Sequence, residues 1–556
     1  MRNLTIGLIA ALTALTACAD HPYDPGQPAV DPNAPVVTIT TPSVGTFAGD
    51  VQTLAVTGTA TDDQAVASVQ VNGVAAALQA DGTWTATVPV AAGTSLLHAV
   101  ALDAQGNQGQ ETRAVVAGPM GAIDMHVPNG ITATLSAQTF AAIGTAAGNF
   151  IQTGDLESMI AADNPVMDLG GGPDCLYVTA SITSMTVGGA QIAMVPQTGG
   201  LALDGELDNV NIGMHLDYAA ACIDGSRDIT IAATHVSVKG NMAIGVAKGA
   251  FAISFDNPDV TISGLDLELG GIPGDIVDLL DLSDALGPIL GWATEKFVVP
   301  MVNTAFAGLN ETKTLNVMGT MVDVSMAPSQ ITFSPAGGLV ELDTSLRAHG
   351  DASSPGFVYV PNQLPAMDLS HGFQLAVADD TANQLFGSMW AAKALDQTID
   401  LKTGPYGDIG QLFDSVELSA AVPPFVDASN PQAGLVLTIG DLMASFKLNG
   451  QVVTEVAINA QVGVKVDADM TGALHLDVGT PTTYVDVLSQ GVAGANQLSS
   501  SQFEEIVSFA ASRVIAVGAG EIGAVPLPTF AGVGVTNLTI DEQTGYLVVD
   551  GAVQVQ

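Results

Sequence analysis

The stretch ITFSPAGGLVELDTSL, residues 331–346, decides the fold because its pattern returns near the end of the chain as LTIDEQTGYLVVDGAV, residues 538–553. Thr332 corresponds to Thr539, Gly338 to Gly545 and Asp343 to Asp550. In both stretches apolar residues alternate with polar ones on either side of a turn, and this predicts two strands joined as a hairpin. A chain that closes two long segments with the same hairpin is predicted to be built from two related halves.

Charge and composition narrow the function classes. The chain has 556 residues and is 47% hydrophobic, which is enough for several packed cores. It carries 56 acidic and 13 basic residues, for a formal net charge of -43. Nucleic acids and anionic membrane faces both need a Lys/Arg surface, so neither is an expected partner. Cation binding, saline surroundings and simple solubility all remain compatible with this charge.

The first residues read as an export signal. MRNLTIGLIAALTALTAC has Arg2 followed by an apolar run too short for a settled membrane helix. Its end, Leu15 to Cys18, resembles the lipobox of bacterial lipoproteins, which predicts a signal peptide at 1–17 and a lipid on Cys18. The alternative is that Cys18 is an ordinary signal-peptide residue. Ala19 is not Asp, so the resemblance favours outer-membrane anchoring, facing the periplasm or the cell surface. Residues 18–35 are Pro-rich and predict an extended tether.

Two cysteines remain after Cys18 is set aside, Cys175 and Cys222. An even pair in an oxidising compartment predicts a disulfide, and two free thiols are the alternative. No His or Cys lies at ligand spacing from either, so a metal site is not expected.

The sequence pattern of residues 36–118 predicts a β-sandwich. Short alternating strands are punctuated by turn pairs such as Asn72-Gly73 and Asp81-Gly82. The order VNG, DGTWTATVPV and a loop of the form D-x-x-GN-x-G resembles bacterial Ig-like domains, which implies a spacer or a binding module. Loop aspartates such as Asp103 are either calcium ligands or solvated turn residues.

From about residue 120 to the last residue, the predicted order of helix, strands, helix and closing strands occurs twice. The first half predicts a helix at residues 136–161 with Phe140 and Ile143 on its apolar face, then long alternating strands, then a helical region at 274–309 kinked at its prolines. The second half predicts a strand, a helix capped by Asp379 or Asp380, more strands, and a helix containing Phe503.

This order resembles the two-barrel members of the tubular lipid-binding superfamily, the bactericidal/permeability-increasing protein and its relatives. The PLP turn at Pro526 to Pro528, the closing GYLVVDGAVQV and the crossing that follows residue 346 carry the resemblance. It implies an α+β fold: two elongated barrels of curved antiparallel sheet wrapped on long helices and joined through a central sheet as a boomerang. Residues 119–330 would form the first barrel, and residues 331–556 the central sheet and second barrel.

The resemblance also implies an apolar pocket in each barrel for the acyl chains of a phospholipid or similar lipid. Small residues, as in AAIGTAAG and FAASRVIAVGAG, would leave room for such chains, and the alternative is that they pack closely in a filled core. Helical spacing gives the candidate lining residues Phe140, Ile143, Phe150, Leu286, Leu290, Phe297, Leu385, Phe386, Met389, Phe503, Ile506 and Val507.

Two departures limit what the resemblance carries over. Basic residues are few, with Lys239 and Lys248 the only local pair, so endotoxin neutralisation is not expected. No G-x-S-x-G, H-E-x-x-H or phosphate-binding glycine loop occurs, so neither catalysis nor a cofactor is expected. The sequence thus favours a lipid-binding or lipid-transfer lipoprotein, and the alternative is a surface structural or adhesion lipoprotein without lipid cargo.

Overall fold

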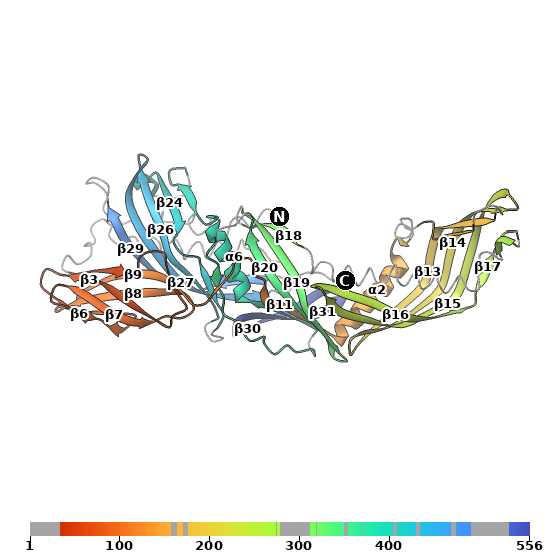
Figure 1. Cartoon of the computed structure of the whole chain (residues 1–556), viewed down its shortest axis with the longest axis horizontal. Helices are drawn as coiled ribbons and strands as arrows, with labels where there is room; N and C mark the ends of the chain where they lie inside the picture. Colours follow the sequence, from red (N-terminus) through yellow and green to blue (C-terminus); the bar gives the residue numbers. More distant parts are fainter. Residues whose placement is uncertain are drawn as a thin grey trace.

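The computed structural model of the chain is an elongated molecule built mainly of β-sheet (Figure 1). The Ig-like domain and a curved sheet lie at one end, a central sheet lies in the middle, and another curved sheet forms the opposite end. The structure describes residues 34–156, 164–170, 176–273, 275–277, 312–317, 320–349, 354–370, 372–403, 409–429, 434–468, 474–490 and 533–555.

The N-terminal domain is a sandwich of two sheets. Side chains alternate between core and solvent along its strands, so that Trp84, Ala86 and Val88 of one strand all lie in the core. The first sheet contains β1 (Val36–Thr41), β3 (Thr53–Thr61), β7 (Thr83–Pro89) and β6 (Ala77–Leu78), in that order. The second contains β2 (Thr46–Gly49), β9 (Gln108–Ala117), β8 (Gly93–Asp103), β4 (Val66–Val71) and β5 (Val74–Ala75).

The central sheet brings the two matching hairpins into one structure. Its strand order is β18 (Lys313–Val317), β19 (Thr320–Ser334), β20 (Gly337–Ala348), β11 (Val127–Ser136), β22 (Phe373–Ala378), β31 (Tyr546–Val555) and β30 (Val533–Gln543). The hairpins β19–β20 and β30–β31 therefore flank the antiparallel pair β11–β22, in which Leu135 lies opposite Phe373. Each strand of this middle pair leads directly into a helix. The sequence repeat thus appears as an approximate two-fold arrangement about β11 and β22. A separate short pair joins β10 (Met120–Gly121) to β21 (Phe357–Val358).

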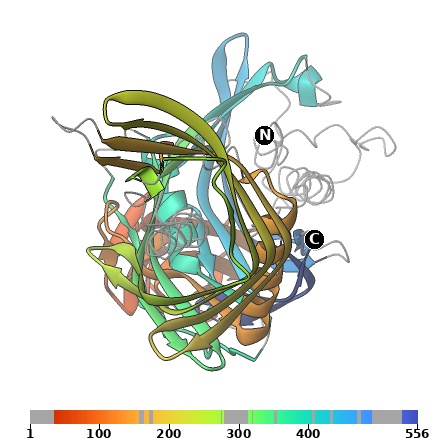
Figure 2. The same cartoon turned by 90° about the vertical axis from the view of Figure 1, so that its right-hand side faces the viewer.

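The first curved sheet is made of long antiparallel strands that bend around one side of a helix (Figure 2). Its strands are β12 (Met167–Gly170), β13 (Tyr177–Gln197), β14 (Gly200–Ala220), β15 (Ile223–Ala247), β16 (Ala250–Ser263) and β17 (Asp266–Glu268). Helix α2 (Ala137–Thr153) begins where the Ser136 Oγ accepts a hydrogen bond from the Thr139 amide, and it ends at Gly154.

The second curved sheet is shorter. Its strands are β23 (Gln397–Asp400), β24 (Ser415–Ala420), β26 (Leu435–Leu448), β27 (Gln451–Ala468) and β28 (Leu474–Val478), with β25 (Phe425–Asp427) beside β26 and β29 (Thr482–Gln490) beside β27. Two helices belong to this half, α6 (Asp379–Ala391) and α7 (Ile409–Leu412). Asp379 and Asp380 were predicted to cap α6, but the cap residue is Ala378, without a side-chain hydrogen bond.

The predicted α+β class, with barrels wrapped on long helices, is wrong. The fold is β-rich: strands account for 66% of the structure and helices for 9%. In the part of the chain that the structure describes there are three helices, of 17, 13 and 4 residues, whereas β15 alone runs for 25 residues. The strands of the first curved sheet extend further than predicted, and α2 ends at Gly154, short of the predicted end at residue 161. Most of the helical region predicted at 274–309, and the helix around Phe503, lie outside the described residues.

The Ig-like domain does not stand apart from the rest of the molecule. It packs with β9 and β8 against β26, β27 and β29 of the second curved sheet (Figure 1). The Ala114 amide donates to Asp441 Oδ1 at 2.9 Å, and the Thr112 amide donates to Asp486 Oδ2 at 2.9 Å. Ala457 and Asn459 point to this outer side, whereas Val456 and Ile458 point to the inner side with the core of the second sheet. The domain therefore covers the outer face and leaves the inner face to the sheet's own core.

Candidate functional site: the concave face of the first curved sheet

The inner face of the first curved sheet is apolar along most of its length, and at the remote end β15 places Arg227 on this face, opposite Leu216. Strand β14 turns Leu201, Leu203, Gly205 and Leu207 inward, and after a local change of phase it turns in every second residue from Val210 to Tyr218. The neighbouring strands follow the same rule, and their buried inward residues include Val178, Ala180, Ile182, Met194, Ile229, Ile231, Val236, Val238, Met242 and Ile244. Tyr218 is the one side chain with a polar atom among the inward positions of β14 described here. This face is therefore a long apolar trough.

The phase change in β14 keeps the apolar side facing inward despite the bend. Asn209 adopts φ 50°, a left-handed conformation that asparagine tolerates better than most residues. Strand β13 has a register shift of its own farther along the pair, between Ile182 and Ser184, which lie opposite Met214 and Gly213. Such irregularities let a long strand bend without turning its apolar residues to the outside.

Helix α2 is much shorter than the strands that it lies on. Its 17 residues extend about 26 Å at 1.5 Å per residue, whereas the 21 residues of β14 extend about 70 Å. Phe140 and Ala147 pack near the central sheet with Met194 and Phe333, and Ile151 at the other end of the helix packs on the remote part of the sheet. The helix therefore covers only part of the trough.

Where α2 does lie on the sheet, it lies very close. A Cβ added at Gly144 would overlap the carbonyl oxygen of Ile192, and one at Gly148 would lie 2.9 Å from the carbonyl oxygen of Ala190. The small residues of AAIGTAAG thus bring the helix backbone onto β13. At this contact they leave no room for a ligand.

The remote end of the trough exposes apolar side chains. Ile223, the first residue of β15, is 72% exposed, and Leu169 of β12 and Leu265 beside β17 are also exposed. Half-buried apolar residues pack against the buried core of this part of the sheet. They are Val166, Met167, Leu176, Met185, Leu207, Val260, Ile262, Leu267, Leu269 and Ile272. The apolar face is consequently continuous from the interior to the surface.

The predicted lining residues of the first half fall in different environments. Phe140 is buried, with its ring centroid 5.8 Å from that of Phe333, and Ile143 is half-buried beside it. Phe150 is 41% exposed and so points away from the trough. The other three predicted residues of this half, Leu286, Leu290 and Phe297, lie outside the described residues.

In the second half, α6 presents a polar face to the central sheet. Met389 is buried and Leu385 and Phe386 are half-buried. The remaining predicted residues, Phe503, Ile506 and Val507, lie outside the described part of the chain. The inner core of the second curved sheet is formed instead by strand and loop residues, namely Leu401, Phe413, Val416, Leu418, Ala444, Phe446, Val456, Ile458 and Val485.

Polar residues that were not predicted from the sequence hold α6 in place. Gln384 accepts from the Leu346 amide at 2.8 Å and donates to the carbonyl oxygens of Ile123 and Met125, while the Ser388 hydroxyl accepts from the Ala348 amide at 2.6 Å. Thr381 lies on the same face and its hydroxyl is 3.0 Å from that of Thr344. The signal was the spacing of Thr381, Gln384 and Ser388 at i, i+3 and i+7, which places three polar residues on one helix face.

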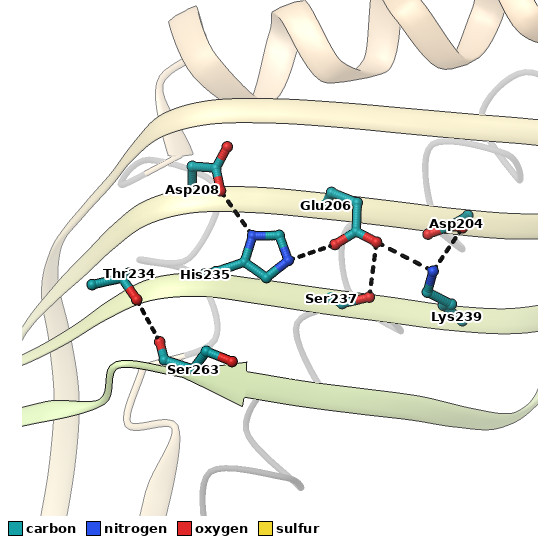
Figure 3. A network of polar contacts seen from close by, with 8 residues as sticks. All are labelled: Asp204, Glu206, Asp208, Thr234, His235, Ser237, Lys239 and Ser263. Carbon is teal, nitrogen blue, oxygen red and sulfur yellow. Dashed lines mark hydrogen bonds and ion pairs between the residues drawn. The ribbon is translucent and has the colours of Figure 1, made fainter.

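The outer face of the first curved sheet is polar and carries a network of charged side chains (Figure 3). His235 of β15 lies between Asp208 and Glu206 of β14, with each of its ring nitrogens 2.8 Å from a carboxylate oxygen. Lys239 is 2.9 Å from Asp204 and 3.3 Å from Glu206, so this lysine is paired with acids rather than forming a basic tip. The Ser237 hydroxyl donates to Glu206 at 3.1 Å.

These contacts set the charge of the histidines. The hydrogen bond with Asp208 is the largest cause that raises the pKa of His235, and Glu206 adds to it. Farther along the same two strands, the hydrogen bond with Asp228 likewise raises the pKa of His215. In the network of Figure 3 the serine and the histidine both contact Glu206 and no contact joins them to each other, so the nucleophile–base contact of a hydrolase is not formed here.

The remaining predicted sites are only partly covered by the structure. Cys222 lies with φ 65° in the turn between β14 and β15; Cys175 is outside the described residues, so their disulfide stays a prediction, as does the lipidation of Cys18. Asp103 accepts hydrogen bonds from the amides of Gln105 and Asn107, as a turn residue does. No group of three or more His, Cys, Asp or Glu side chains is placed to hold a metal ion within the described ranges. Among these residues, too, no helix is long and apolar enough to cross a membrane.

Comparison with known proteins identifies a relative for the N-terminal domain alone. Residues 35–118 match the family model described as glucodextranase, domain B, in agreement with the predicted Ig-like domain. No curated protein matches the chain.

Three solved structures resemble the larger part of the chain at low scores. The lipopolysaccharide binding protein is 14% identical, with a TM-score of 0.36 over 77% of this chain and 99% of that one. Two P47 proteins of Clostridium botulinum are less similar: that of E1 is 10% identical, with a TM-score of 0.23 over 76% of this chain and 98% of its own, and that of A2 is 9% identical, with a TM-score of 0.24 over 76% and 96%. Likeness at these scores does not support a statement about function.

Proposed function

We propose that the protein binds lipid, with an acyl chain lying along the concave apolar face of the first curved sheet. The observation that supports this is the long series of apolar inward positions on β13, on β14 and on β15 from Ile229 onward, which is far longer than the helix that covers part of it. Its exposed apolar end at Leu169, Ile223 and Leu265 gives a chain a way in.

The energetics of such binding need no charged contact. Burying one methylene contributes roughly 0.8 kcal/mol, so a tail of about twelve carbons could gain roughly 10 kcal/mol before the entropy of binding is subtracted. The headgroup would remain at the exposed end, where Arg227 alternates onto the inner face opposite Leu216, and Asp224 and Asp228 alternate onto the outer face.

The proposal includes the envelope location predicted from the first residues. Export, lipidation of Cys18 and outer-membrane anchoring would place the apolar trough beside its source of lipid. We propose no catalytic role and no cofactor.

A structural or adhesion lipoprotein without cargo is the second candidate. The close contact of Gly144 and Gly148 with β13 favours it, because there the helix and the sheet meet directly. The two functions differ in whether the remote part of the trough, beyond α2, takes up a foreign molecule.

The test is lipid content. The chain without residues 1–18 is purified in the absence of detergent, extracted with organic solvent and analysed by mass spectrometry. We expect roughly one acyl lipid per chain, fewer in Val260→Trp, which fills the inner side of β16, and no loss in Thr261→Trp, which changes the adjacent outward residue. Protein that is folded but free of lipid in all three preparations would favour the adhesion candidate.

A further inference from the structure

The contact between the Ig-like domain and the second curved sheet has an unusual charge balance. Three carboxylates meet there, Glu111 from β9, Asp441 from β26 and Asp486 from β29. One cation, Arg113 of β9, lies among them, and its guanidinium is 2.6 Å from Glu111. Asp441 is fully buried, Asp486 is 7% exposed and Arg113 is 9% exposed. With every group ionised, the buried contact would carry two uncompensated negative charges.

Hydrogen bonds hold the two aspartates in place without neutralising them. Asp441 Oδ1 accepts from the Ala114 amide, and Asp486 Oδ2 accepts from the Thr112 amide. Asp441 Oδ2 is buried without a hydrogen-bond partner in the described part of the chain. A buried, unpartnered carboxylate oxygen is costly when ionised, and the cost falls when the carboxyl group takes up a proton.

Within the described ranges, the other groups that face the contact do not supply a second positive charge. Strand β1 contributes only the Ile39 amide, which donates to Glu111, and β27 contributes the neutral Asn459, whose side chain donates to the Thr112 carbonyl oxygen at 3.3 Å. His98 of β8 stacks on Tyr484 of β29 at a centroid distance of 4.5 Å. Burial lowers the pKa of His98, so this ring is neutral at pH 7.

We propose that the Ig-like domain is a pH-dependent clamp on the second curved sheet, closed when Asp441 and Asp486 are protonated and released when they ionise. Burial is the largest cause that raises the pKa of Asp486 to about 7, with Glu111 next among the groups that raise it; burial also raises the pKa of Asp441. In the released state both side chains return to water and to ordinary pKa values.

The sign of the effect follows from linkage. The docked state holds protons that the released state gives up, so docking is strongest below the ordinary aspartate pKa of 3.8 and weakens as the pH rises through about 7. Each proton involved changes the docking equilibrium about tenfold per pH unit across that range.

Release would reach beyond the interface itself. Phe47 of β2 packs on Trp390 near the end of α6, with ring centroids 5.5 Å apart. The Thr94 hydroxyl of β8 donates to the Pro423 carbonyl oxygen at 3.3 Å, and the ring of Phe425 packs so closely on Gly93 that no Cβ would fit between them. These contacts tie the clamp to α6 and to the segment between β24 and β26.

The test uses hydrogen exchange of the full chain between pH 5.5 and 8.5, corrected for the intrinsic pH dependence of exchange. Protection of the Thr112 and Ala114 amides, which both cross the contact, should fall by up to about tenfold per pH unit for each proton released between pH 5.5 and 7, and should level off at higher pH. In the double variant Asp441→Asn and Asp486→Asn, the uncharged side-chain amide oxygens can still accept hydrogen bonds from the Thr112 and Ala114 amides. Protection of these two amides should therefore stay high at pH 8.5. Asp63→Asn, on an exposed loop, should behave as the wild type.

The core of the Ig-like domain serves as the internal reference. Protection of the Ala99 and Ala101 amides in β8 should not change with pH if the domain stays folded while it undocks. The proposal is overturned if Thr112 and Ala114 show no excess loss of protection in the wild type, or if a folded double variant loses it as the wild type does.

Discussion

His235 and Asp208 lie directly opposite each other on β15 and β14, with Nδ1 of the histidine 2.8 Å from Oδ1 of the aspartate. The other ring nitrogen meets Glu206 at the same distance, so the imidazole satisfies both contacts only when it carries both protons. His215 and Asp228 form a second opposite pair farther along the same strands, 2.6 Å apart. The outer face of the first curved sheet therefore holds two histidine–aspartate pairs that can be tested against each other.

We predict that Asp208→Asn lowers the pKa of His235 and leaves that of His215 unchanged, because the lost hydrogen bond is the largest cause of the upward shift. NMR titration of the two imidazole signals measures both values in one sample. Asp228→Asn is the matched control and should have the reverse effect.

The same pairs make a prediction about stability. A histidine pKa raised by folding contributes stability that is fully present below pH 6.5 and is lost as the pH rises through the folded-state pKa. The wild type should therefore lose more thermal stability than His235→Asn between pH 6 and 9. Equal loss in both proteins would show that the contacts with Asp208 and Glu206 contribute nothing.

Close contact between α2 and β13 predicts a large effect from a small substitution. Gly144→Ala adds a Cβ that overlaps the Ile192 carbonyl oxygen, so the helix must move away, at a cost of about 1–3 kcal/mol in the free energy of unfolding. Chemical denaturation measures the change. Thr145→Ala, one residue along on the exposed side, is the control and should be neutral or slightly stabilising because alanine favours helix. An unchanged Gly144→Ala protein would mean that α2 is not seated on this strand.

The sequence predicted the strands and the positions of α2 and α6, but it did not predict which face of α6 is buried, and the reason is physical. A period of two has little ambiguity over twenty residues, so β14 and the hairpins β19–β20 and β30–β31 could be predicted directly. A helix is recognised from its 3.6-residue period only where its buried face is apolar. The buried face of α6 is polar, because it carries Thr381, Gln384 and Ser388. The change of phase at Asn209 and the docking of the Ig-like domain arise from contacts between distant segments, and no local pattern encodes them.

A substitution of Gln384 tests whether these polar contacts hold α6 on the central sheet. Replacing it by alanine leaves the Leu346 amide and the carbonyl oxygens of Ile123 and Met125 without their partner, in a place where water does not reach. Each unsatisfied buried group is worth about 1–3 kcal/mol, so we expect a loss of at least about 3 kcal/mol in the free energy of unfolding. The control is Gln330→Ala, an exposed glutamine whose side chain bonds only the neighbouring Thr332 among described residues. A loss no larger than that of the control would contradict the described network.

The candidate lining residues show where helical spacing stops being informative. Phe140 and Ile143 were placed correctly on the inner side of α2, whereas Phe150 follows the same spacing and is exposed. The trough is made mainly by strands, whose inward residues were visible in the alternation of VNIGMHLDY. Strand positions such as Ile212 and Met214 could be identified as lining residues only by knowing which side of the sheet α2 covers. That information comes from the tertiary structure.

Asp380, near the start of α6, predicts how stability depends on pH. The residue is buried, and its Oδ1 accepts from the Val360 amide at 3.2 Å. Burial, and then the charge of Asp379, raise its pKa to about 7. Because the folded value exceeds the ordinary 3.8, the group contributes stability below pH 3.8 that is lost as the pH rises towards 7. The N-terminal end of the helix favours the ionised form, so it limits this loss.

We therefore expect the wild type to lose stability, by a few kcal/mol at most, between pH 4 and 8, and Asp380→Asn to show a flatter profile over the same range. Asparagine keeps an oxygen to accept from the Val360 amide, so its effect is one of charge rather than of a lost hydrogen bond. Asp224→Asn, on the exposed tip of the first curved sheet, controls for the change in net charge. Denaturant titrations at several pH values measure the profiles. If both Asp380→Asn and Asp224→Asn follow the wild-type profile, the carboxyl group of Asp380 is ionised throughout the range. Its burial then does not govern its charge.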